Sequence, residues 1–260
     1  MTSFKDFFKV SMADKFREMN FILLINLLAV VVSAIWILVT GHFSNDTFLQ
    51  VTLSWSFFAM FVAFIRLTVR HEKTYTRDSY RLIPIGDTKF YLTNLLTSFV
   101  GFIYVGVIEL AAFALTAAFN WQNYMDSLNL VTMMNGQTDV PWNKLIVGML
   151  LMILLMVGVL ILTWSTISLI HLLTRVGNSF LPYSRSRIIS FIVYVVVILV
   201  VLRIVGYVMN FMQDSIFMMN NSGDAWSFTL NLLGILVLAA LEIVLNIYLM
   251  SRWVETVSES

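Results

Sequence analysis

Six long runs of apolar residues, separated by polar connections, make up most of the chain. The runs cover residues 21–40, 49–69, 90–113, 145–173, 188–209 and 228–250. A helix needs about 20 residues to cross the roughly 30 Å of bilayer hydrocarbon, and every run is long enough to do so. The alternating pattern of a membrane β-barrel is missing. We therefore expect an all-α, polytopic membrane protein whose six transmembrane helices form one domain over residues 21–252.

Composition supports this reading. The 260 residues are 59% hydrophobic and 12% charged, whereas soluble globular domains carry roughly 25% charged residues. The high hydrophobic content also excludes a disordered chain. A net charge of +1 offers no basic surface for nucleic acid.

The basic residues indicate how the chain crosses the membrane. Of the 16 Lys and Arg, 13 lie before the first run, in the second or fourth connection, or after the last run. The other three are Lys144, Arg66 and Arg203. Because Lys and Arg accumulate on the cytoplasmic side, we expect both termini to be cytoplasmic. We also expect a multi-pass protein of the cell membrane, in particular a bacterial plasma membrane.

The segment 1–20 predicts an amphipathic interfacial helix. Its large apolar residues recur every three or four positions between charged ones: Phe4, Phe7, Phe8, Met12, Phe16 and Met19. Such a helix lies at the membrane surface, where its lysines extend toward lipid headgroups. The alternative is a basic flank that only sets the topology.

The cytoplasmic connection 70–89 predicts a short helix from about Thr74 to Leu82. The residue before Pro84 disfavours helical angles, so the helix should end there. Asp87 is a suitable N-cap for the next span. This places Tyr75, Tyr80, Leu82 and Ile83 where another protein can contact them. Alternatively, the charges set only topology and the turn only links two helices.

Two further segments lie on the expected outer side. Residues 121–143 form a polar external loop that begins and ends near tryptophans, Trp121 and Trp142, as suits a headgroup belt. The shorter segment 210–226 has mixed polarity, which fits a re-entrant or surface element better than a span.

Three charged residues fall inside apolar runs: Glu109, Arg203 and Glu242. An ionised side chain there costs at least about 2.5–3.5 kcal/mol unless it is paired or hydrated. Glu109 and Arg203 lie at similar expected depths, so we expect an ion pair between the third and fifth spans. The pair either marks a substrate path or locks the bundle. His171 has no second ligand at metal-binding spacing.

Motifs for catalysis are missing from the sequence. It contains no phosphate-binding loop, GxGxxG, HExxH or GxSxG motif, no cysteine and only three histidines. We therefore expect no enzyme activity, and we assign no catalytic, cofactor-binding or metal-binding residue.

The order of these parts resembles the membrane subunit of an ABC type-2 export permease. The likeness rests on the lead-in helix, six spans with both ends inside, and the segment EKTYTRDSYRLIPIGDTKFYLTNLL that begins at Glu72. By this resemblance residues 1–20 are the elbow helix and 70–89 the coupling segment. The residues that would dock an ATPase are then Glu72, Tyr75, Arg77, Tyr80, Arg81, Leu82, Ile83 and Pro84.

The resemblance also implies partners. Two copies of a separate ATPase would bind ATP and Mg²⁺, this chain would need no cofactor, and a second permease subunit, identical or homologous, would complete the path through the lipid. The substrate would be amphipathic: a drug, a peptide or a lipid-linked molecule. The family usually has its larger external element between the fifth and sixth spans, whereas the longer loop here lies between the third and fourth.

Two other functions fit the same residues. One is a membrane scaffold, immunity or sensor protein that does not transport and uses the connection 70–89 only for binding. The other is a small ion-coupled transporter in which Glu109, Arg203 and Glu242 couple ion and substrate.

Overall fold

The computed structural model describes residues 4–41, 47–76, 83–119, 121–122, 125–126, 142–179, 187–219 and 225–252. These residues form no strand, and their six long helices are α1 (Phe4–Val39), α2 (Thr47–Thr76), α4 (Asp87–Ala118), α6 (Trp142–Ser179), α7 (Arg187–Met219) and α8 (Ala225–Arg252). All six contain a stretch long and apolar enough to cross a membrane. The all-α prediction with six spans is confirmed.

The helices extend beyond the apolar runs. Helix α1 continues from Phe4 to Val39 without a break near residue 20, so an interfacial helix distinct from the first span is not shown and stays a prediction. Helix α7 continues to Met219, so the first half of the segment expected as a re-entrant or surface element is a helical extension. Most of the expected external loop 121–143 lies outside the described residues.

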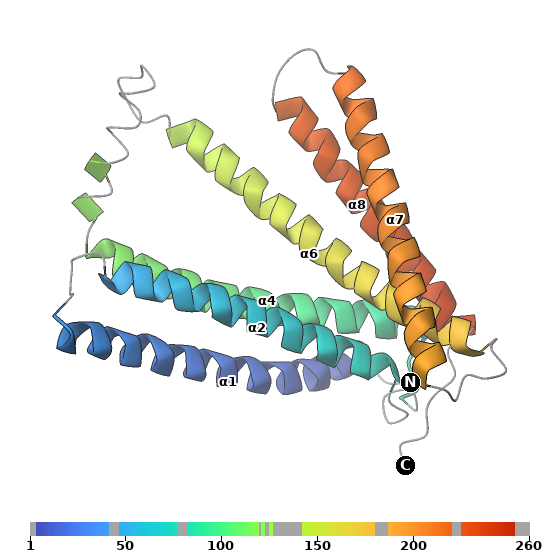
Figure 1. The fold of residues 1–260 in the computed structure, drawn as a ribbon, viewed down its shortest axis with the longest axis horizontal. Helices are drawn as coiled ribbons and strands as arrows, with labels where there is room; N and C mark the ends of the chain where they lie inside the picture. Colours follow the sequence, from blue (N-terminus) through green and yellow to red (C-terminus); the bar gives the residue numbers. More distant parts are fainter. Residues whose placement is uncertain are drawn as a thin grey trace. The chain divides into compact units, whose positions relative to one another are not determined.

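Helices α1, α2 and α4 form the first of two compact units, which holds residues 1–74 and 92–145. The three helices run side by side (Figure 1) and contact one another along their lengths. Trp55 on α2 donates to the hydroxyl of Ser33 on α1 at 2.9 Å. A Cβ atom on Gly101 of α4 would lie 3.3 Å from Leu67 of α2, so the missing side chain allows these two helices to approach closely.

The second unit holds residues 75–91 and 146–260, including the end of α2, the start of α4 and helices α6, α7 and α8 (Figure 1). Its apolar core joins the last three helices: Leu162 from α6 and Ile235, Leu238 and Ala239 from α8, with Leu155, Ile161 and Val205 packed against them. A Cβ on Gly158 would lie 3.4 Å from Ile235.

Polar side chains are buried in both units while large apolar ones face outward. Buried residues include Lys15, His71, Asn94, Glu109, Glu242 and Asn246, whereas Leu27, Val32, Trp36, Phe57 and Leu241 are among many exposed apolar residues. Lipid tails are as apolar as leucine, so exposed apolar side chains are stable there and polar groups are satisfied between helices. The buried polar groups therefore mark where specific contacts concentrate.

Candidate functional site

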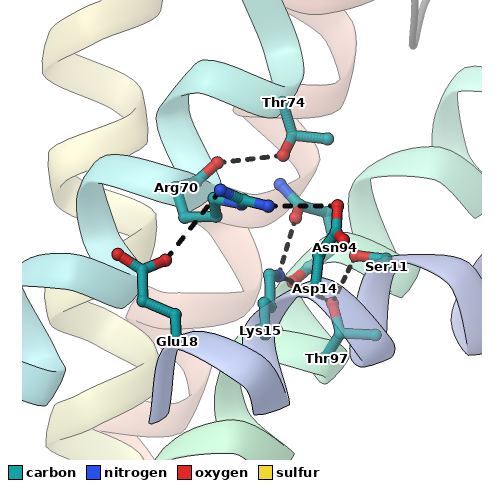
Figure 2. A network of polar contacts seen from close by, with 8 residues as sticks. All are labelled: Ser11, Asp14, Lys15, Glu18, Arg70, Thr74, Asn94 and Thr97. Carbon is teal, nitrogen blue, oxygen red and sulfur yellow. Dashed lines mark hydrogen bonds and ion pairs between the residues drawn. The ribbon is translucent and has the colours of Figure 1, made fainter. Parts of the chain in front are cut away.

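One group of buried polar residues joins the three helices of the first unit. We call it the Lys15 cluster and define it as Ser11 and Lys15 on α1, His71 on α2, and Asn94, Thr97 and Ser98 on α4. Ser11 and Lys15 are four positions apart, and the α4 residues are three and four apart, so each set lies on one helix face. Figure 2 shows most of this cluster, with the polar groups of α1 and α4 facing one another.

Lys15 is the centre of the cluster and is only 1% exposed. Its ammonium nitrogen lies 2.9 Å from both the backbone and side-chain oxygens of Asn94, 2.7 Å from Thr97 Oγ1 and 2.8 Å from Ser98 Oγ. An ammonium group has three protons, so these four neutral oxygens supply more acceptors than it needs. The expectation that this lysine extends toward lipid headgroups is wrong, because α4 offers it a complete set of acceptors.

Asn94 and His71 connect the cluster to α2. The amide nitrogen of Asn94 donates to the backbone carbonyl of His71 at 2.9 Å, and His71 Nδ1 lies 3.1 Å from Ser98 Oγ. His71 has no exposed surface. The start of α1, the end of α2 and the start of α4 are therefore held together by buried hydrogen bonds.

Ion pairs form the outer rim of this cluster. Arg70 on α2 lies 3.0 Å from Asp14 and 4.0 Å from Glu18 on α1, and Arg66 lies 3.6 Å from Glu18. These side chains are partly exposed, where single pairs contribute about 0–1 kcal/mol. Arg66, which lies inside an apolar run of the sequence, thus has the carboxylate of Glu18 as its partner.

The residues assigned to the coupling segment fall into three groups. Glu72 and Tyr75 belong to the last turns of α2, and Ile83 and Pro84 precede α4. Arg77, Tyr80, Arg81 and Leu82 lie outside the described residues, as does most of the predicted helix 74–82. The Gly86 carbonyl accepts a hydrogen bond from the Phe90 amide at 2.9 Å, so Asp87 lies in the first turn of α4 instead of at the cap. As an acidic residue of the first turn, Asp87 still lies at the positive end of the helix.

Tyr75 differs from its sequence-based expectation. It has no exposed surface, so its ring is not available to a partner protein. It stacks on Tyr91 with ring centroids 5.3 Å apart and planes at 7°, and it meets Phe90 edge-on at 6.1 Å. Asn246 of α8 donates to the Tyr91 hydroxyl at 2.9 Å. The two ends of the connection are thus brought together in the second unit and tied to α8.

Glu109 and Arg203, expected to pair, belong to different units. In the first unit the Glu109 carboxylate accepts hydrogen bonds from Asn26 at 2.7 Å and from Ser56 at 2.6 Å. In the second, Arg203 lies 3.3 Å from the Tyr207 hydroxyl and over its ring. Each therefore has partners within its own unit, and their pairing stays a prediction.

Glu242 lies in a second buried group, the Glu242 cluster, formed by Ser165 and Thr166 on α6 and Glu242 and Asn246 on α8. The Glu242 carboxylate is bound by the Ser165 hydroxyl at 2.7 Å and by the Thr166 hydroxyl at 2.8 and 3.1 Å. Asn246, one turn along α8, donates to the backbone oxygen of Ser165 at 2.8 Å. The hydrogen bonds of this cluster join the buried face of α6 to the buried face of α8.

Sequence reasoning missed most of these residues. The polar positions Thr93, Asn94, Thr97 and Ser98 form an i, i+3, i+4 pattern inside an apolar run, which could have indicated a buried polar face. A similar pattern is present in the second unit's helices, since Glu242 and Asn246 are four positions apart and Ser165 and Thr166 lie in the polar group Thr163, Ser165, Thr166 and Ser168. Their role is visible only once α6 and α8 are packed together.

No group of three or more potential metal ligands occurs among the residues that the structure describes.

No family model, curated protein or solved structure matches the chain. The six apolar helices, with polar groups between them and apolar side chains outward, define a multi-pass membrane protein. The Lys15 cluster, the Glu242 cluster and the residues at the two ends of the α2–α4 connection are its most specific polar and aromatic contacts among the described residues.

Proposed function

We propose that the protein is the permease subunit of an ATP-driven ABC exporter in a bacterial plasma membrane, with both termini cytoplasmic. Two such subunits, identical or homologous, form the path for an amphipathic substrate. Two copies of a separate ATPase bind ATP and Mg²⁺ and dock on the connection between α2 and α4.

The observation that carries the proposal is the way this connection is anchored. Tyr75 before it and Tyr91 after it stack on each other, so the two ends of the connection are fixed at one place. A force applied to the connection would therefore act on α2 and α4 together. A connection that only joins two spans does not need a stacked pair of fully buried tyrosines, such as Tyr75 and Tyr91, at its two ends.

The Lys15 cluster supports the same reading from the first unit. His71 lies one turn before Tyr75, and Asn94 lies just after Tyr91, and both are hydrogen-bonded within the cluster. Movement of either helix end would therefore also act on α1 through Lys15. Packed bundles respond to such a displacement as rigid bodies, which is what alternating access requires.

Purification of the tagged chain from its own host, in mild detergent, tests the docking. We expect it to carry along a protein that hydrolyses ATP in a Mg²⁺-dependent manner. Replacing Arg77, Arg81 and Leu82 together by alanine should remove most of that ATPase from the preparation. A matched control replaces Arg185, Arg187 and Leu181, from the other basic connection, by alanine. Equal ATPase recovery from both triple variants would refute docking on this connection.

An ion-coupled transporter is the second candidate. It is favoured by Glu109 and Glu242, whose partners among the described residues are amide and hydroxyl groups instead of cations. Transport that continues without any ATPase, and that follows an imposed ion gradient in vesicles of the purified chain, would favour this candidate over the first.

A further inference from the structure

We propose that Glu242 is a reversible proton-binding site, in which the Ser165 hydroxyl reverses the direction of its hydrogen bond, while Thr166 continues to donate, when the carboxyl group gains or loses a proton. This inference goes beyond the proposed exporter function and does not depend on an ATPase.

The site is enclosed within the second unit. Glu242 is 4% exposed and Ser165 fully buried. Both hydroxyls approach the carboxylate at direct hydrogen-bond distance, 2.7 Å for Ser165 and 2.8 Å for Thr166. At these distances each O···O pair is a direct hydrogen bond, with a proton held between the two oxygens.

Each hydroxyl has a second acceptor for its single hydrogen. Ser165 Oγ and Thr166 Oγ1 both lie 2.9 Å from the backbone oxygen of Leu162, one turn earlier on α6. A hydroxyl donates one hydrogen but can accept as well. Each can therefore donate either to Glu242 or to Leu162 without moving its oxygen.

These alternatives allow the same heavy-atom arrangement to satisfy both forms of the carboxyl group. When Glu242 is ionised, both hydroxyls donate to it. When a proton binds to Oε2, the new O–H group donates to Ser165 Oγ, and Ser165 turns its own hydrogen to the Leu162 oxygen. Thr166 continues to donate, now to Oε1 at 3.1 Å. One proton is gained, and the hydrogen bonds rearrange by rotation of a hydroxyl alone.

The charged and titratable groups of the surrounding helices do not fix Glu242 in its ionised form. In α6, Arg175 bonds to His171; in α7, Arg203 contacts Tyr207; in α8, Arg252 lies over Tyr248. Asn246, which donates to the Ser165 backbone oxygen, also donates to the hydroxyl of Tyr91 of α4. Among the described residues no cation lies within ion-pair distance of Glu242. An intramembrane carboxylate without a cation is costly in its charged form, so the neutral form must be available.

Difference infrared spectroscopy of the purified, detergent-solubilised chain during a pH titration tests the proposal. The stretching band of a protonated carboxyl group should appear as the pH falls, and it should be missing in Glu242→Gln. Glu109→Gln, which removes the other intramembrane carboxyl group, is the matched control and should retain the Glu242 band. Ser165→Ala should keep the band but shift it to higher frequency, because the carboxyl group loses a hydrogen-bond partner.

Two results would overturn the assignment. One is a set of pH-dependent carboxyl bands that is the same in the unmodified chain and in Glu242→Gln. The other is a Glu242 band that responds to added Na⁺ at fixed pH and not to pH, which would make the site a sodium site. If Glu242→Gln does not fold, the Ser165→Ala spectrum decides: an unshifted band would refute contact between this hydroxyl and a protonated Glu242.

Discussion

The ammonium nitrogen of Lys15 lies 2.9 Å from the side-chain oxygen of Asn94 and 2.9 Å from its backbone oxygen. Asn94 thus binds the cation twice, and with its amide nitrogen it also binds the His71 carbonyl on α2. One asparagine on α4 therefore connects α1 and α2. The stability of the first unit should depend on this residue more than on the lysine itself.

We expect Asn94→Ala to destabilise the protein strongly and Lys15→Met to do so much less. In Asn94→Ala the ammonium group keeps three of its four acceptors, but the His71 carbonyl also loses its donor on α4, and each buried polar group left unsatisfied costs about 1–3 kcal/mol. Lys15→Met removes the buried cation itself, and an apolar replacement of similar volume is often close to neutral. Thermal unfolding in detergent measures this, with the exposed Lys9→Met as control. Equal losses in the two single variants would contradict the double contact.

Tyr91 should hold the α2–α4 connection in place through its ring. Tyr91→Phe keeps the stack on Tyr75 and loses the hydrogen bond from Asn246, whereas Tyr91→Ala loses both. We expect trypsin to cleave at Arg77 and Arg81 several-fold faster in Tyr91→Ala than in Tyr91→Phe, as followed by intact-mass spectrometry. Tyr194→Ala, which removes a half-exposed tyrosine from α7, is the control and should leave the cleavage rate unchanged. If Tyr91→Ala is cleaved no faster, the stack does not restrain the connection.

Gly101 should tolerate a side chain poorly because α2 lies against it. Valine there must displace Leu67, which already lies 3.3 Å from the position of a Cβ atom, and overpacking of this kind costs about 1–3 kcal/mol. Gly148 in α6 has no atom within 4 Å of its would-be Cβ, so Gly148→Val is a matched control. We expect a lower melting temperature for Gly101→Val only. Comparable melting temperatures for the two variants would refute the close approach of α2 and α4.

Glu109 should serve mainly as an acceptor for two neighbouring side chains. Glu109→Ala leaves the half-buried Asn26 amide and Ser56 hydroxyl without their acceptor, and the cost should stay below the roughly 1–3 kcal/mol of a fully buried unsatisfied group. Glu109→Gln retains one carbonyl oxygen and should be milder. Chemical unfolding in mixed micelles ranks the two variants. Should the alanine variant be as stable as the glutamine variant, these hydrogen bonds contribute little to the bundle.

Several features of the fold follow from local sequence alone. Each apolar run is long enough to span a bilayer, and the first run ends before Gly41 and the second before the charged segment that begins at Arg70, so the number of spans and their approximate limits need no tertiary information. Gly41, which ends α1, has a φ of 73°, a conformation that other residues rarely adopt. The ends of the helices were less predictable, because α1 and α7 continue through polar residues that an apolar pattern excludes.

The candidate site could be predicted only in part. Glu109 and Glu242 are recognisable because charge inside an apolar run is costly, but Arg203, identified by the same rule, contacts a tyrosine on its own helix. Lys15 resembles any lysine next to a membrane span until α4 supplies its acceptors. Tyr75 resembles an exposed contact residue until Tyr91 covers it.

The sequence by itself determined that this is a helical protein with six spans, because hydrophobicity over about 20 residues is a local property that decides insertion into lipid. The tertiary structure alone decided which polar groups meet. Hydrogen bonds between Lys15 and Asn94, or between Ser165 and Glu242, join residues 79 and 77 positions apart. Their formation depends on how each helix is rotated against its neighbour, and that rotation is set by packing between helices.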